Sequence, residues 1–236
     1  MVFSSVVSAR DFVVREFRDH GRVEIRSAVD PVSLQADPAR KAGFKAALGA
    51  AVRETTTGVF THDVEVTLVW LIEESRRHQT HLVADLDNVM KPILDAVTGA
   101  EGIMIDDNQI QSIDASWVTP AGQTGFDLKF TALTSDDYVS REGLSFVEFS
   151  TDRCYLLPQM ERPAQVALAD GYRRAWAAYR HMLASGIAES AARSVLPTGR
   201  PFPRARLGRF KVIHHADLHG DTENQNSGGH APPGLD

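Results

Sequence analysis

Apolar and polar residues follow two periods along the chain, which predicts strands and helices. Apolar side chains alternate with polar ones at residues 22–28, 62–72, 110–118 and 126–133, and this favours strands. Asp37-Pro38, an N-cap residue and a first-turn proline, opens a helix that is expected to run to about Arg53. A second helix is expected at 88–98, with Asn88 as its cap, Pro92 in about its first turn and Gly99 after its end.

The segments between and after these elements give weaker patterns. Residues 73–80 are expected to be a charged loop, and 81–86 a short strand or extended entry to the second helix. Later, a strand is expected within 146–157, an amphipathic helix at 163–184 and a final strand at 209–214. The fold class is therefore α/β (α+β), a mixed sheet flanked by helices. We expect a core domain at 22–135, an extension at 136–216 and a disordered tail at 217–236.

Composition places the chain among globular proteins. It has 236 residues, 43% hydrophobic and 24% charged, which are ordinary values for a folded soluble domain. The single cysteine, Cys154, excludes an intramolecular disulfide. Charged residues soon after the N-terminal apolar run argue against a signal peptide or a membrane span, so a cytoplasmic protein is expected.

The net charge of −6 disfavours a nucleic-acid partner, but the charge is unevenly distributed. Residues 162–211 contain 10 Lys or Arg and 2 acids, whereas residues 1–130 contain 13 Lys or Arg and 19 acids. The basic block supplies candidate DNA contacts: Arg173, Arg174, Arg180, Arg204, Arg206, Arg209 and Lys211. A solvated helix face, with its aromatic stripe packed on a core or a dimer partner, explains the same pattern.

The candidate chemistry lies in residues 84–110. In an extended chain Asp85 and Asp87 point to one side, and on the helix Asp87, Lys91 and Asp95 are each four residues apart. A second acidic pair, Asp106-Asp107, follows the apolar residues 103–105 and can return a carboxylate to the first pair. Three carboxylates would then share one site.

Such a cluster needs a cation. Two carboxylates about 4 Å apart repel by roughly 1 kcal/mol in water and about 4 kcal/mol near a protein surface. Oxygen ligands without cysteine or a well-placed histidine favour Mg²⁺ or Mn²⁺, which also bind phosphate oxygens. This chemistry points to phosphodiester hydrolysis, with Lys91 offsetting charge on the scissile phosphate.

The order of these residues resembles the signature of the RusA family of Holliday junction resolvases. The matching positions are Asp85, Asp87, Asn88, Lys91, Asp95, Asp106, Asp107 and Gln109. The resemblance spans 23–133, and residues 31–35 resemble the family's Pro-x-Ser-x-Asn element, with Gln35 in place of Asn.

The resemblance carries expectations about mechanism and partners. It implies a small α/β fold, a homodimer and Mg²⁺- or Mn²⁺-dependent paired nicking of branched DNA, as in recombination and repair. Asp85, Asp87, Asp107 and Lys91 would be catalytic, and Asp106 would join the three aspartates as a metal ligand. Asn88, Asp95 and Gln109 would have supporting roles.

Other functions remain open at this stage. Asp85-Leu86-Asp87 could be the nucleophile and acid of a HAD-type phosphatase, although Asn88 and the short gap to Asp106 disfavour it. A non-catalytic DNA-binding or assembly protein on the same scaffold is a third reading, with a protein partner bound by residues 136–236. His214, His215 and His219 lie close in sequence, but they lack an acid or cysteine partner at a diagnostic spacing, so we interpret them as a surface cluster.

Overall fold

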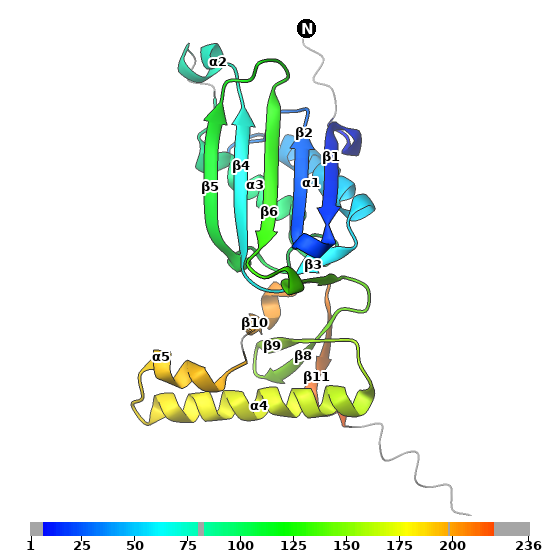
Figure 1. The fold of residues 1–236 in the computed structure, drawn as a ribbon, viewed down its shortest axis with the longest axis vertical. Coiled ribbons are helices and arrows are strands. Elements are labelled where there is room, and N and C mark those ends of the chain that lie inside the picture. Colours follow the sequence, from blue (N-terminus) through cyan, green and yellow to red (C-terminus); the bar gives the residue numbers. More distant parts are fainter. Residues whose placement is uncertain (1–6, 80–82, 198, 220–236) are drawn as a thin grey trace, which may run out of the picture. The chain divides into compact units, whose positions relative to one another are not determined.

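A computed structural model describes residues 7–79, 83–197 and 199–219 (Figure 1). The chain separates into two compact units. The first consists of Met1–Glu142 with Arg206–Arg209, and the second of Gly143–Ala205 with Phe210–Asp236.

The first unit is built on a five-stranded sheet in the order β1-β2-β6-β4-β5. Neighbouring strands are antiparallel except β4 and β5, which are parallel. A parallel pair requires a long crossover connection, and here residues 72–109 supply it. The strands are β1 Phe12–Phe17, β2 Arg22–Ser27, β4 Val64–Leu71, β5 Ile110–Val118 and β6 Gly125–Ala132, while β3 Gly58–Phe60 pairs separately with β7 Tyr138–Ser140.

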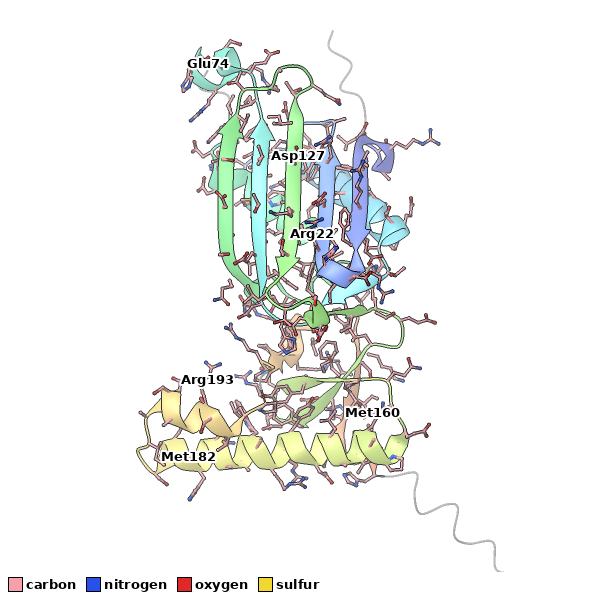
Figure 2. All side chains as sticks on the ribbon, in the orientation of Figure 1. Arg22, Glu74, Asp127, Met160, Met182 and Arg193 are labelled. Atoms are coloured by element: carbon pink, nitrogen blue, oxygen red, sulfur yellow. The ribbon has the colours of Figure 1, made fainter. Side chains whose placement is uncertain are left out.

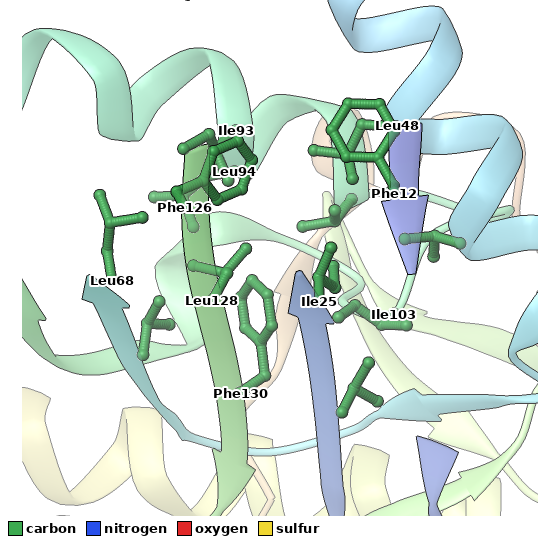
Figure 3. Close-up of a cluster of buried hydrophobic side chains, with 14 of the residues drawn as sticks. Phe12, Ile25, Leu48, Leu68, Ile93, Leu94, Ile103, Phe126, Leu128 and Phe130 are labelled. Atoms are coloured by element: carbon green, nitrogen blue, oxygen red, sulfur yellow. The ribbon is translucent and has the colours of Figure 1, made fainter. Parts of the chain in front are cut away.

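Helices α1 (Pro38–Thr55) and α3 (Leu86–Val97) lie behind the sheet in the view of Figure 1 and cover one of its faces. Side chains alternate along β4, where Val66, Leu68 and Trp70 are buried and Glu65 is exposed. Figure 3 shows part of the resulting core, in which Leu48 and Ile93 of the helices belong to the same buried cluster as Phe126 and Phe130 of β6. Burying each such side chain contributes about 1.5–3 kcal/mol.

The opposite face of the sheet has no covering helix among the described residues and is polar. Figure 2 shows Asp127 on this face, where its carboxylate pairs with Arg26 on the neighbouring strand at 2.8 Å. The pair is exposed to solvent and adds little to stability.

Helix α1 begins as predicted, because the Asp37 side chain accepts hydrogen bonds from the amides of Ala39 and Arg40. The predictions for α3 were wrong at two points. Its N-cap is Asp85 rather than Asn88, and Pro92 lies inside the helix instead of in its first turn.

Pro92 is tolerated because another part of the chain replaces its missing N–H. In a regular helix that N–H would bond the carbonyl of Asn88. Here the amide of Leu34 donates to the Asn88 oxygen at 2.7 Å. The segment of residues 31–35 therefore completes the helix, and it also receives the Lys41 ammonium on the Leu34 carbonyl at 2.7 Å.

Some helices and strands of the first unit were not predicted, and one predicted loop contains a helix. Strands β1 and β3 were not predicted, and the expected loop at 73–80 contains helix α2, Glu74–Gln79. Of the two possibilities expected for 81–86, a short strand or an extended entry to the second helix, the described part contains no strand: residues 83–85 are irregular, with Asp85 extended, and Leu86 already belongs to α3. Residues 81 and 82 lie outside the described residues. The strands predicted at 22–28, 62–72, 110–118 and 126–133 are confirmed as β2, β4, β5 and β6.

The second unit contains a four-stranded sheet, β10-β9-β8-β11, with helix α4 against it. The single strand expected at 146–157 is a hairpin that turns at Asp152, which has a positive φ of 57°. The elements are β8 Ser145–Ser150, β9 Arg153–Leu157, α4 Arg162–Ala184, α5 Glu189–Ala192, β10 Phe202–Pro203 and β11 Lys211–His214. The expected helix at 163–184 and final strand at 209–214 are confirmed, and the expected tail lies mostly outside the described residues.

Cys154 is buried in β9, and its burial raises the pKa of the thiol to about 12. It therefore stays protonated at neutral pH and packs as a small apolar residue.

No helix among the described residues is both long and apolar enough to cross a membrane.

At Gly125 the backbone of β6 lies too close to the backbone of β2 for a side chain to fit. Its φ of +132° is rarely adopted by other residues, and a Cβ there would lie 2.1 Å from the backbone oxygen of Ser27. We expect Gly125→Ala to lower the free energy of unfolding by at least about 2 kcal/mol, measured by urea denaturation. Gly122→Ala, in an exposed turn with open space at the Cβ position, should change it by under about 0.5 kcal/mol. Equal effects of the two changes would contradict this account.

Candidate functional site

The acidic residues singled out in the sequence lie in the crossover between the parallel strands β4 and β5. Asp85 occupies the N-cap position of α3 without a side-chain hydrogen bond to the helix, and Asp87 is in its first turn. Asp106 and Asp107 stand at the start of the short 3-10 turn Asp107–Gln109, which leads directly into β5. The site is thus formed by both ends of one connection within the first unit.

Lys91 joins the helix to the second acidic pair. Its ammonium donates to Asp107 Oδ2 at 2.7 Å and lies 2.7 Å from Asp95 Oδ1, one turn further along α3. The hydrogen bond to Asp107 raises the pKa of Lys91, and the same bond lowers the pKa of Asp107. Both groups are therefore charged at neutral pH. Lys45 from α1 holds the other Asp95 oxygen at 3.1 Å.

Asp106 is buried, with 6% of its surface exposed, and its partner comes from far along the chain. Arg206 donates from Nη1 to Asp106 Oδ1 at 3.0 Å and lies 3.5 Å from Asp107 Oδ1. Burial, followed by the neighbouring Asp107 carboxyl, raises the pKa of Asp106 even though Arg206 opposes the shift. Sequence reasoning placed Arg206 only among DNA contacts, since nothing in its spacing ties it to an acid 100 residues earlier.

Gln109 fixes the turn that carries the acidic pair. Its side-chain oxygen accepts from the amides of Ile105 and Asp106 at 2.7 and 2.9 Å. Its side-chain nitrogen donates to the carbonyls of Phe60 and His62 at 2.8 and 2.9 Å. A residue with 4% exposure thus satisfies four backbone groups and ties the turn to the chain between β3 and β4.

Asp85 has an extended backbone, but Asp87 already lies in α3, so the expectation that both point to one side of an extended chain was wrong. The chain enters α3 at Leu86, and both carboxylates are exposed at its N-terminal end. Within the described residues neither side chain has a hydrogen bond or ion pair. Asp87 stands four residues before Lys91, so helix geometry places it on the edge of α3 that also faces Asp107.

The oxygen atoms of the candidate ligands suit a hard divalent cation. All candidate ligands are carboxylates, and the two at the helix start have no competing partner in the described part of the chain. In the structure, however, Lys91 and Arg206 neutralise the second pair. Across the described residues, no three of these carboxylates have oxygens within 4.8 Å of one another. The structure brings Lys91, Asp95, Asp106 and Asp107 together, and Asp85 and Asp87 only to the same helix.

A cavity of about 490 Å³ adjoins this site within the first unit. It lies beside Asp95 and Glu101, and its cationic lining comes from α1 and the Arg206–Arg209 segment: Lys45, Arg53, Arg206 and Arg209. Arg209 also lies 3.5 Å from Glu101.

The remaining candidate DNA contacts belong to the second unit. Arg173, Arg174 and Arg180 of α4 and Lys211 of β11 are exposed, and Arg204 is half-buried. The aromatic stripe of α4 packs on the sheet, with the rings of Tyr172 and Tyr155 stacked at 4.3 Å between centroids and Trp176 edge-on to Phe149 at 5.8 Å. These rings therefore form core rather than a stacking platform.

Comparison with known protein families gives a match over the segment that contains this site. Residues 21–125 match the family model described as Endodeoxyribonuclease RusA. The matched segment contains all the acidic residues of the site, Lys91 and Gln109, and it leaves out β1 and Arg206. No curated protein matches the chain.

Replacing Gln109 should loosen the acidic turn. Gln109→Ala leaves two buried amides and two carbonyls without their partner, so we expect the free energy of unfolding to fall by about 2–4 kcal/mol in urea denaturation. Asn108→Ala is the matched control, because the Asn108 side chain is exposed and makes no hydrogen bond among the described residues. A Gln109→Ala protein as stable as the Asn108→Ala control would refute the anchoring role.

Proposed function

We propose that this chain, whose residues 21–125 belong to the endodeoxyribonuclease RusA family, is a metal-dependent endonuclease that hydrolyses phosphodiester bonds in branched DNA such as Holliday junctions. The observation that carries the proposal is the 2.7 Å contact between Lys91 and Asp107. It links the two acidic segments across the crossover, and Asp87 shares the helix edge of Lys91.

The proposed cation is Mg²⁺ or Mn²⁺. Asp85, Asp87 and Asp107 would hold it, with Asp106 beside them, because hard oxygen donors suit these ions. When bound, the ion supplies an activated water and neutralises charge at the leaving 3′ oxygen. Its arrival would compete with Lys91 and Arg206 for the second acidic pair.

Each of the other residues of the site has its own role in the proposed reaction. Lys91 stays protonated at neutral pH, since its contacts with Asp107 and Asp95 raise its pKa, and it offsets charge that develops on the scissile phosphate. Gln109 holds the turn, and Arg206 keeps the buried Asp106 in place. Asp95 orients Lys91 from one turn along the helix.

DNA would be held by cations near the site. Lys45, Arg53, Arg206 and Arg209 line the adjoining cavity and suit backbone phosphates. The exposed arginines of α4 supply a second basic surface. We propose a homodimer, because two sites related by a twofold axis match the symmetry of a four-way junction, and a further protein partner for residues 136–236.

The phosphatase alternative gains no support from the fold. Such enzymes place the nucleophilic aspartate at the end of a strand in a doubly wound parallel sheet. Here Asp85 stands at the N-cap position of a helix after an irregular segment, and β4 and β5 are the only parallel pair in the described five-stranded sheet.

The central test is cleavage of labelled four-way, flap and linear duplexes in Mg²⁺. The parent protein should nick branched DNA, whereas Asp87→Asn and Asp107→Asn should each reduce the rate by at least about 100-fold, the size expected when one group that stabilises transition-state charge is lost. The neutral asparagines keep the side-chain shape, so DNA binding by gel shift should persist.

Asp114→Asn is the matched control for this test. Asp114 is an exposed aspartate of β5 in the same unit, and it makes no hydrogen bond or ion pair among the described residues. Its variant should cut at the parental rate. A parent protein that binds branched DNA but never cuts it would favour the non-catalytic reading and overturn the enzyme.

Metal removal gives an independent prediction. EDTA should abolish cleavage without unfolding the first unit, because that unit has an extensive core of buried apolar side chains. Added Mg²⁺ or Mn²⁺ should restore the rate, with folding followed by circular dichroism. Undiminished cleavage in EDTA would exclude the proposed role of the carboxylates.

A further inference from the structure

A second group of side chains with metal-binding chemistry lies in the second unit, and none of its members belongs to the proposed nuclease site. Asp170 projects from α4, while His215 begins the short 3-10 turn His215–Leu218 and His219 follows it. His215 Nε2 lies 2.7 Å and His219 Nε2 3.2 Å from the same oxygen, Asp170 Oδ1. Asp170 is the acid partner that sequence spacing did not reveal, because it precedes the histidines by about 45 residues.

The surrounding contacts hold both sides of the cluster in place. Arg162, at the start of α4, donates to the carbonyl of Asp217 at 2.9 Å and to that of Leu218 at 3.2 Å. Leu218 and Ala169 are buried together in the core of the unit. The residues that precede His219 and Asp170 are therefore fixed by packing, and only part of each ligand side chain reaches solvent.

We propose that Asp170, His215 and His219 bind a divalent transition-metal ion of the zinc class. The cluster is the only group of three or more His, Cys, Asp or Glu in the described part of the chain whose ligand atoms all lie within 4.8 Å of one another. Two imidazoles and one carboxylate favour zinc and its neighbours over Mg²⁺, which prefers oxygen.

The geometry requires small movements to accept an ion. Ligands about 2.1 Å from a tetrahedral centre lie about 3.4 Å from one another. The two nitrogen-to-oxygen distances are shorter than this by less than 1 Å, so slight spreading of the side chains makes room.

Such an ion would join β11 and the turn after it to helix α4. Three protein ligands leave a fourth position for water or another group. The proposal is independent of the nuclease site, whose candidate ligands are all carboxylates in the first unit. The two sites would therefore differ in the metal that they select.

The test uses the full chain stripped of metal with a chelator and then titrated with Zn²⁺ or Co²⁺. Bound zinc is measured by atomic spectrometry after dialysis, and cobalt by its visible absorption, so neither readout depends on DNA cleavage. Asp170→Asn and His215→Ala should weaken binding by at least about 100-fold, more than the roughly 10–100-fold effect of losing an outer-sphere partner.

Two controls make the result specific. His214→Ala removes the neighbouring histidine, which pairs with Glu148 at 3.1 Å outside the cluster, and should bind zinc as the parent does. Asp87→Asn in the nuclease site should also bind as the parent. Melting of the metal-free proteins checks folding, and Asp170→Asn preserves the size of the side chain it replaces.

Selective loss of zinc in the Asp170 and His215 variants, with cobalt absorption bands that vanish in parallel, supports the site. Less than one equivalent of micromolar-affinity zinc in the parent protein would overturn it. Equal zinc binding by His215→Ala and His214→Ala would also overturn it, because the contacts of His215 and His219 with Asp170 would then be hydrogen bonds with no role in metal binding.

Discussion

The parallel pairing of β4 with β5 is the constraint on which the candidate site depends. All other neighbours in the five-stranded sheet are antiparallel, but this pair obliges the chain to cross over the sheet before it can continue. The crossover contains α3 and ends in the acidic turn before β5. Both acidic segments therefore belong to one connection. Lys91 of α3 links the helix to the second segment, because its ammonium lies 2.7 Å from Asp107 and also 2.7 Å from Asp95 of the helix itself.

Charge within the site is balanced by the protein itself. Asp106 and Asp107 are adjacent, and two such carboxylates would repel strongly with one of them buried. Lys91 lowers the pKa of Asp107, while Arg206 provides the partner that a buried Asp106 requires. Asp85 and Asp87 are not neutralised in this way among the described residues. The exposed end of α3 is thus the part of the site best able to accept a cation or a phosphate-bound metal.

The two units present different ligand chemistry. The first offers carboxylates from a crossover that belongs to the RusA family match, and the second offers two imidazoles and a carboxylate from α4 and the turn after β11. Hard oxygen ligands and imidazole nitrogens select different ions. The two proposed sites would therefore be distinguishable by which metal each retains.

Sequence alone determined the elements with clear periodicity and the acidic motif that resembles the RusA signature, because these depend on neighbours within a few residues. Helix α1, α4 and the strands β2, β4, β5 and β6 follow from such local patterns. The tertiary structure decided the features that depend on contacts between residues far apart in the sequence. Leu34 supplies the hydrogen bond that lets Pro92 lie inside α3, Arg206 reaches Asp106, and Asp170 meets His215 and His219. The spacing of residues along the sequence does not predict these contacts, since they form only when packing brings separate segments together.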